Sequence, residues 1–174
     1  MPRAKKIMNY PLVALRGKVI FPDTVNNFDA GRLISLTAVS RASEENMDLF
    51  VAMQPDAQKE EIGPEDVCKV GTVVKIKQIA KLPSNNLRIT VTGLYRAKAE
   101  EIYEEEGCLF ANVSELKPVH GDPVLEEAYF RTAQDVMREI RSNEMRLSKE
   151  SASSLDNVTD PDIYSCLLYT SDAA

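Results

Sequence analysis

Few side chains in this sequence are spaced for chemistry. The three cysteines, Cys68, Cys108 and Cys166, are odd in number and far apart, and His120 is the single histidine among 174 residues. A zinc site draws on Cys and His ligands in close pairs, so the sequence predicts no metal site. Since the cysteines show no disulfide framework, we expect free thiols and a reducing, cytoplasmic setting.

The sequence also lacks the motif of a nucleotide-binding loop. A Walker-type phosphate loop reads GxxxxGK[ST], because its glycines let backbone N–H groups approach the phosphates. Gly17-Lys18 is the nearest match, but Val19 follows it and Leu12 stands where the first glycine belongs. The sequence therefore predicts no ATP site and no bound cofactor.

Nucleophilic catalysis would need His120 beside a serine or cysteine. His120 lies in PVHGDP, a predicted turn ahead of a helix start, and no serine stands in a GxSxG elbow. A Ser–Lys dyad stays open, since both residue types are common here. The glutamates between 100 and 106 indicate a solvated loop. We predict no catalytic residue, so this chain by itself is not an enzyme.

The net charge and the apolar content of the sequence indicate which kinds of partner the chain can bind. The formal net charge is −6 and the pI is near 5.0, whereas nucleic-acid binding rests on clustered Lys and Arg. No stretch approaches the ~20 apolar residues of a membrane helix. Residues 1–10 have no apolar run of a signal peptide. We expect neither a nucleic-acid nor a membrane partner. The basic residues of the central hairpin fit a solvated face: Lys75, Lys77, Arg88, Arg96 and Lys98.

The elements that position these residues can be read from periodicity. Apolar and polar residues alternate over 87–99, where only Leu94 breaks the period of two, and this predicts a strand. Residues 70–81 form the other strand of a hairpin with its tip at 82–86. Gly93 predicts a bend or bulge where the sheet curls into a barrel.

Shorter patterns predict the remaining elements of this half. The predicted strands cover 12–15, 19–21, 48–54 and 108–116, and a short amphipathic helix covers about 33–39. Pro22 ends the second of these strands, because proline cannot donate to a ladder. The acidic segment YEEEG at 103–107 is predicted to be a turn.

The character of the chain changes after residue 120. Asp122-Pro123 and Asp160-Pro161 predict helix starts, since each pairs a capping carboxylate with a proline in the first turn. A further helical stretch is predicted at about 146–156. The first helix is expected to run to about Arg141, with an apolar face that packs either on the barrel or on a neighbouring protomer. That face comprises Leu125, Tyr129, Ala133, Val136, Met137 and Ile140.

These patterns predict an α+β fold. We expect a β-rich domain over 9–117 and an incomplete helical extension over 118–163. The final residues SCLLYTSDAA do not continue the helical pattern. We therefore expect 164–174 to be a non-native tail on a gene that has been cut short.

Five motifs occur in an order that is specific as a set. They are PLVALRGKVIFP at 11–22, FDAGR at 28–32, LFVAMQPDA at 49–57, VGTVVKIKQIAKLP at 70–83 and VTGLYRAK at 91–98. The set resembles the amino-terminal domain of the ATP-dependent Lon protease over about residues 9–163. The resemblance implies a β-rich, PUA-like barrel followed by a helical subdomain. It also implies recognition of misfolded and regulatory proteins and assembly of a hexamer in the full-length parent, whose ATPase and serine protease domains would follow.

Recognition of unfolded substrates calls for modest apolar patches at loop tips on a rigid sheet. The candidate contacts are Pro22, Val25 and Phe28 near the second strand, with Leu82 and Pro83 at the hairpin tip. Core positions for Phe28 and its neighbour Phe21, and a capping role for Leu82, are the alternatives. Many members of this family are strongly apolar before the Gly-Arg pair, whereas this chain reads DTVNN, so we expect weaker contact through that loop.

Three other interpretations stay open. The chain is a free-standing adaptor with the same fold, an RNA-binding PUA-like domain, or an enzyme of another type. An RNA-binding domain would show a basic groove and stacking aromatics. The net charge of −6, the lack of Trp and the 6% aromatic content argue against it. An enzyme would need convergent polar residues that the sequence does not show.

Overall fold

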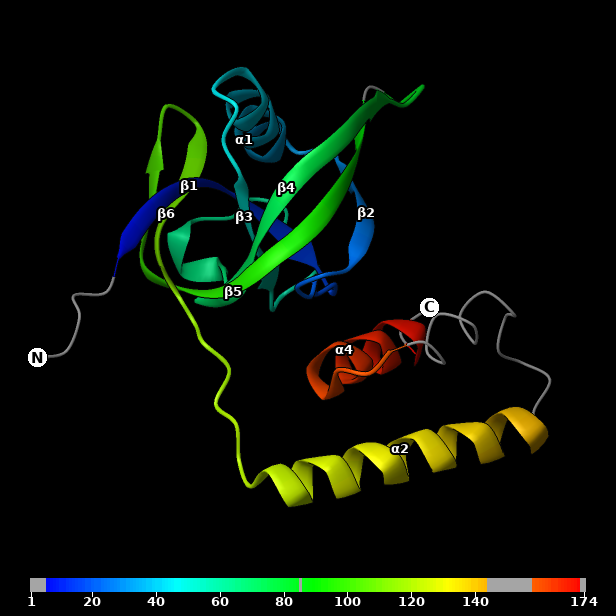
Figure 1. The fold of residues 1–174 in the computed structure, drawn as a ribbon. Helices are drawn as coiled ribbons and strands as arrows, with labels where there is room; N and C mark the ends of the chain where they lie inside the picture. The colour runs from blue at the N-terminus through cyan, green and yellow to red at the C-terminus, as the bar shows by residue number, and fades with distance from the viewer. Residues whose placement is uncertain (1–5, 85, 144–157, 173–174) are drawn as a thin grey trace, which may run out of the picture. The chain divides into compact units, whose positions relative to one another are not determined.

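The computed structural model describes residues 6–84, 86–143 and 158–172 of the chain (Figure 1). The chain divides into two compact units, 1–117 and 118–174, and each is described by itself. The helical stretch predicted at 146–156 lies outside the described residues.

A closed mixed sheet forms the first unit. In the described part of the chain its strands are β1 (Ile7–Arg16), β2 (Val25–Ala30), β3 (Leu49–Gln54), β4 (Val70–Lys81), β5 (Leu87–Glu105) and β6 (Cys108–Glu115). Their order is β2-β5-β4-β3-β1-β6, and β5 also pairs with β6, so the sheet closes on itself. β1 and β3 run parallel, and the other described pairs are antiparallel. This sheet, together with its helices, confirms the predicted α+β class.

β5 pairs with three strands, β2, β4 and β6, because it is long and bent. Its register against β4 passes from Val73–Tyr95 to Val74–Gly93, which leaves Leu94 as the extra residue of a bulge. The predicted bulge is confirmed, and the turn over residues 21–24 docks against it. The Asp23 N–H donates to the Gly93 carbonyl (3.1 Å), and the Gly93 N–H donates to the Thr24 carbonyl (3.0 Å). A side chain at 93 would collide with the Phe21 carbonyl oxygen, so this position requires glycine.

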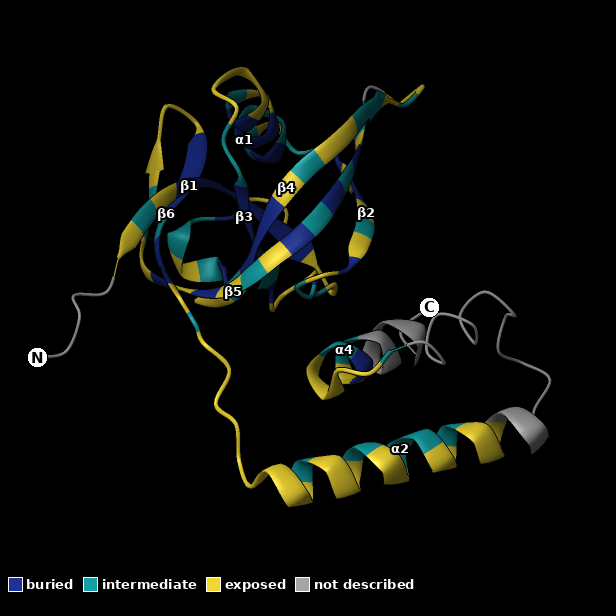
Figure 2. Cartoon of the chain, in the orientation of Figure 1, coloured by how far each residue is buried: buried dark blue, intermediate teal, exposed yellow. Residues whose placement is uncertain are grey.

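Two apolar clusters lie on opposite faces of β1. Val13 and Leu15 enter the cluster beneath α1 (Leu33–Glu44), whereas Leu12 and Ala14 enter the other cluster. The second cluster is covered by the loop around the short 3₁₀ helix η1 (Pro64–Asp66). A strand with both faces buried reads as a continuous apolar run, as β1 does (Figure 2).

The strand predicted at 19–21 is wrong. Residues 17–24 form a loop that turns at Gly17 (φ +58°) and Asp23 (φ +57°). Ile20 is buried in the core, and its carbonyl accepts a hydrogen bond from the Thr72 hydroxyl (2.6 Å). The segment is apolar because Ile20 fills the core, and its backbone pairs with a side chain in place of a ladder.

The predicted acidic turn is also shorter than expected. β5 continues to Glu105, and the turn consists of Glu106 and Gly107, both with positive φ. Glu106 pairs with Arg41 of α1 at 2.5 Å, and Glu100 accepts a hydrogen bond from the Ser114 hydroxyl. All of these glutamates except Glu106 are therefore exposed residues of a strand.

The second unit contains α2 (Pro123–Asn143) and α4 (Pro161–Asp172). Both start as predicted: Asp122 accepts a hydrogen bond from the Val124 N–H (2.8 Å), and Asp160 accepts one from the Asp162 N–H (2.9 Å). Because α4 runs to Asp172, the helix continues past residue 163. The non-native tail over 164–174 stays a prediction. Among the helices that the structure describes, none combines the length and the hydropathy that a membrane span requires.

The face of α2 that packs inside this unit overlaps the predicted one only in part, since Ala133 and Met137 of that face are partly buried. Phe130 meets Tyr164 of α4 edge to face, with ring centroids 5.2 Å apart, and Tyr164 is buried. Figure 2 shows a partly buried stripe along α2 beside an exposed side. Four residues of the predicted apolar face are exposed: Leu125, Tyr129, Val136 and Ile140.

Candidate functional site

The predicted substrate contacts lie at opposite ends of β2. Val25 pairs with Thr92 and Ala30 pairs with Leu87, so the start of β2 faces the middle of β5 and its end faces the hairpin tip. Five residues of strand span ~17 Å. The structure therefore does not join the 22–25 segment and the 82–83 tip into one patch.

Exposed apolar side chains gather at the start of β2. Val25 is 69% exposed, and Pro22 is partly exposed on the turn that docks at Gly93. Leu94 is 37% exposed and lies two residues beyond Thr92, the partner of Val25. We call Pro22, Val25 and Leu94 the β2-start patch. The sequence did not predict Leu94 as an exposed residue of this patch, although its break in the alternation was the signal.

The other predicted contacts divide between surface and core. Pro83 is exposed at the hairpin tip, while Leu82 is half-buried and its N–H donates to the Asn86 carbonyl (2.9 Å), which closes the tip. Phe28 is only 6% exposed and belongs to the cluster beneath α1. It lies on the inner face of β2, whereas Val25 lies on the outer face.

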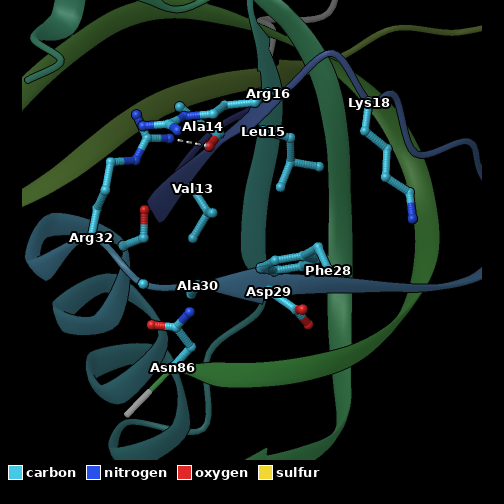
Figure 3. Close-up of a pocket in the computed structure, with 12 residues that line it drawn as sticks. Val13, Ala14, Leu15, Arg16, Lys18, Phe28, Asp29, Ala30, Arg32 and Asn86 are labelled. Carbon is cyan, nitrogen blue, oxygen red and sulfur yellow. Dashed lines mark hydrogen bonds between the residues drawn. The ribbon is translucent and has the colours of Figure 1, made fainter. Parts of the chain in front are cut away.

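A pocket of about 540 Å³ opens beside Phe28, between the end of β1, the end of β2 and the start of α1 (Figure 3). Its floor is apolar and buried, with Val13, Leu15 and Phe28 among the residues that form it. Polar and charged side chains surround this floor: Arg16, Lys18, Asp29, Arg32, Ser35 and Asn86.

Arg32 anchors one side of the pocket through neutral partners. Its Nη2 donates to the Ala14 carbonyl (2.9 Å) and its Nη1 donates to Gln54 Oε1 (2.7 Å). Gln54 is only 1% exposed, and its amide in turn donates to the Asp56 and Lys59 carbonyls. Burial lowers the pKa of the Arg32 guanidinium, and the charge of Arg16 lowers it further. Figure 3 shows the two arginine side chains converging.

The other charged side chains of the pocket, Asp29 and Lys18, also have hydrogen-bond partners. Asp29 accepts two hydrogen bonds from Arg88, each 2.8 Å, and this pairing lowers the pKa of its carboxyl. Lys18 Nζ donates to the Asn27 carbonyl (2.6 Å). Within the described residues, no carboxylate forms an ion pair with Arg16, Lys18 or Arg32.

The start of α1 faces the same space. Arg32 is the N-cap residue in an extended conformation; its side chain caps no N–H group, and the Ser35 N–H donates to the Arg32 carbonyl (3.0 Å). Ser35 lines the pocket and is 4% exposed, yet its hydroxyl has no hydrogen-bond partner among the described residues. The pocket thus presents the unused Ser35 hydroxyl and an unpaired positive charge.

Residues suited to covalent or metal chemistry are dispersed. In the part of the chain that the structure describes, no group of three or more His, Cys, Asp or Glu residues could hold a metal ion. His120 is exposed and lies 3.7 Å from a Glu126 oxygen. Cys68 and Cys108 are free thiols, and Cys108 is buried.

Cys108 should be the least reactive kind of thiol. Burial raises its pKa to about 11, against a weaker opposing effect from Arg41. At pH 8 the thiolate fraction is then about a hundredfold lower than in an unperturbed thiol. We expect iodoacetamide to leave Cys108 unmodified in the folded protein and to label it after denaturation, as peptide mapping by mass spectrometry would show. Labelling of the folded protein at the rate of a small-molecule thiol would contradict this.

The fold shows which class of protein domain this chain is similar to. It superposes on the N-terminal domain of the Lon protease of Mycobacterium avium complex with a TM-score of 0.68 and 17% identity, over 90% of this chain and 79% of that one. A Lon N-terminal domain protein from Xanthomonas campestris matches with a TM-score of 0.57 and 19% identity, over 94% and 98% of the two chains. The structure is therefore an α+β domain with the fold of Lon amino-terminal domains.

Sequence comparison then shows the family. Residues 9–170 match the ATP-dependent protease La (LON) substrate-binding domain, and the chain belongs to this family. The Lon protease of Clostridioides difficile is 36% identical over 157 residues, and that of Bacillus thuringiensis is 31% identical over 151 residues. Each alignment covers 87% of this chain but only 20% and 19% of the relatives, so the chain spans about a fifth of their length. The predicted resemblance is confirmed.

Proposed function

We propose that this chain is the substrate-recognition and assembly part of an ATP-dependent Lon serine protease. It binds misfolded and regulatory proteins and itself needs no cofactor and performs no catalysis. The parent protein supplies the ATPase and the peptidase and acts as a hexamer in the bacterial cytoplasm. Membership of the substrate-binding family is the observation that carries this proposal.

The β2-start patch gives the proposal a physical site. Unfolded proteins differ from folded ones in exposing apolar side chains, which lose water when they meet an apolar surface. Val25 presents such a surface on a strand that the hydrogen bonds at Gly93 hold in place. The patch is small, so a single contact is weak. Several copies in an oligomer would bind one long substrate much more tightly through effective concentration.

Charged substitutions in the patch should weaken substrate capture. We expect the double variant Val25→Asp/Leu94→Asp to bind a labelled, chemically unfolded protein about tenfold more weakly, because each aspartate must be desolvated on contact. Both side chains are exposed, so the thermal midpoint should hold. Fluorescence anisotropy measures the binding, and Val70→Asp, at an exposed valine outside the patch, is the matched control. Undiminished capture by the double variant would exclude the patch as the contact.

A further inference from the structure

The pocket at the start of α1 has a charge imbalance that its own residues do not correct. Arg16, Lys18 and Arg32 line it with Asp29 as the only acidic residue, and Asp29 is already held by Arg88. Arg32 bonds only to neutral acceptors, and Arg16 has no side-chain partner among the described residues. Two neighbouring guanidinium groups without a counter-charge, in a chain of net charge −6, form a local site for an anion.

Neutral donors in the pocket support the same ligand. The start of α1 carries the partial positive charge of the helix dipole, and its residues Arg32 and Ser35 line the pocket. The Ser35 hydroxyl is buried, lines the pocket and lacks a partner among the described residues. A buried hydroxyl without a hydrogen bond costs free energy, which an anionic acceptor would recover.

The strand edges beside the pocket indicate that the anion is part of a polypeptide. β1 pairs with β3 through residues 12–16 and with β6 only through 7–11, while β2 pairs only with β5. β2 therefore has one edge without a ladder in the described structure, except that Lys18 bonds the Asn27 carbonyl there, whereas residues 12–15 of β1 are buried. Free strand edges pair with extended polypeptide, whereas a phosphate ion would leave them unused.

We propose that this pocket binds a carboxylate group of a polypeptide. Arg16 and Arg32 pair with the carboxylate oxygens, Ser35 donates its hydroxyl, and the apolar floor at Phe28 receives the neighbouring side chain. A volume of about 540 Å³ is in the range of small-ligand sites. The carboxylate comes either from the C-terminus of the chain or from an Asp or Glu side chain. This inference rests on the proposed function and specifies one chemical feature of the substrate.

Three labelled peptides that all end in leucine separate these sources. One has a free C-terminus, the second is amidated, and the third is amidated with a glutamate before the leucine. We expect the full 174-residue chain to bind the free acid about tenfold more tightly than the amide, as measured by fluorescence anisotropy. Equal recovery of affinity by the glutamate peptide assigns the side-chain carboxylate as a source.

Results that contradict the carboxylate proposal can be distinguished from results that contradict the proposed function. Equal binding of all three peptides would overturn the carboxylate pocket while leaving the proposed function intact. Failure to bind any peptide or any unfolded protein would overturn both. Stronger displacement of the acid peptide by inorganic phosphate than by acetate at equal ionic strength would also overturn the carboxylate assignment.

Single substitutions locate the effect in the pocket. Arg16→Gln should weaken binding of the acid peptide about tenfold and leave the amide unchanged, whereas Arg96→Gln, at an exposed arginine elsewhere on β5, should change neither. Ser35→Ala should weaken the acid peptide about threefold without lowering the thermal midpoint, because its hydroxyl has no partner to lose. Unchanged affinity of Arg16→Gln for the acid peptide would overturn the proposal.

Discussion

Gly93→Ala should lower the free energy of unfolding by about 3 kcal/mol. A methyl group at this position would overlap the Phe21 carbonyl oxygen, and backbone cannot move aside as a flexible side chain can. Separating the two segments would break the hydrogen bonds that join Gly93 to Asp23 and Thr24. Denaturant titration followed by circular dichroism measures the loss.

The same variant should also weaken capture of unfolded protein, because the turn at Gly93 holds Pro22 and Val25 in place. Gly121→Ala is the matched control, since a methyl group there would come no closer than 3.6 Å to another side chain. It should change the stability by less than about 0.5 kcal/mol. A loss below about 1 kcal/mol for Gly93→Ala would show that the turn can move away from β5 without cost.

Arg32→Met should destabilise the first unit by about 2 kcal/mol, even though it removes a partly buried charge. Arg32 supplies the donors for the Ala14 carbonyl and for Gln54 Oε1, and both acceptors belong to buried residues. An acceptor left without a partner costs ~1–3 kcal/mol, and relief of the guanidinium desolvation offsets part of this.

Arg16→Met is the control for this second variant. It removes the same charge from the same pocket, but Arg16 is exposed and makes no side-chain hydrogen bond within the described residues. Its unfolding free energy should stay within about 0.5 kcal/mol of the parent chain. Equal stability losses for the two variants would mean that charge in the pocket, and not the bonds of Arg32, sets the effect.

Local patterns predicted much of the fold. The alternation over 87–99 predicted β5, and Gly93 predicted its bulge, because side chains alternate between the faces of any strand. Asp122 and Asp160 predicted the starts of α2 and α4, since a helix cap forms between residues two or three positions apart. The ordered motifs predicted the family, which the comparisons confirm.

Positions that depend on partners far along the chain were not predictable in this way. The run at 19–21 has the composition of a strand, yet Ile20 bonds to a hydroxyl 52 positions away. In the sequence, Leu94 is only a break in the alternation of apolar and polar residues. The pairing of β2 with β5 makes it part of an exposed patch.

Short-range patterns and ordered motifs are local properties of a chain, and they were enough to predict an α+β domain of the Lon substrate-binding family. Tertiary structure alone decided which apolar residues are exposed and which charges meet. Val25 lies on the outer face of β2, whereas Phe28 lies on its inner face. Arg16 and Arg32 meet because β1 ends where α1 begins. Such long-range placement follows from strand register, which no single segment encodes.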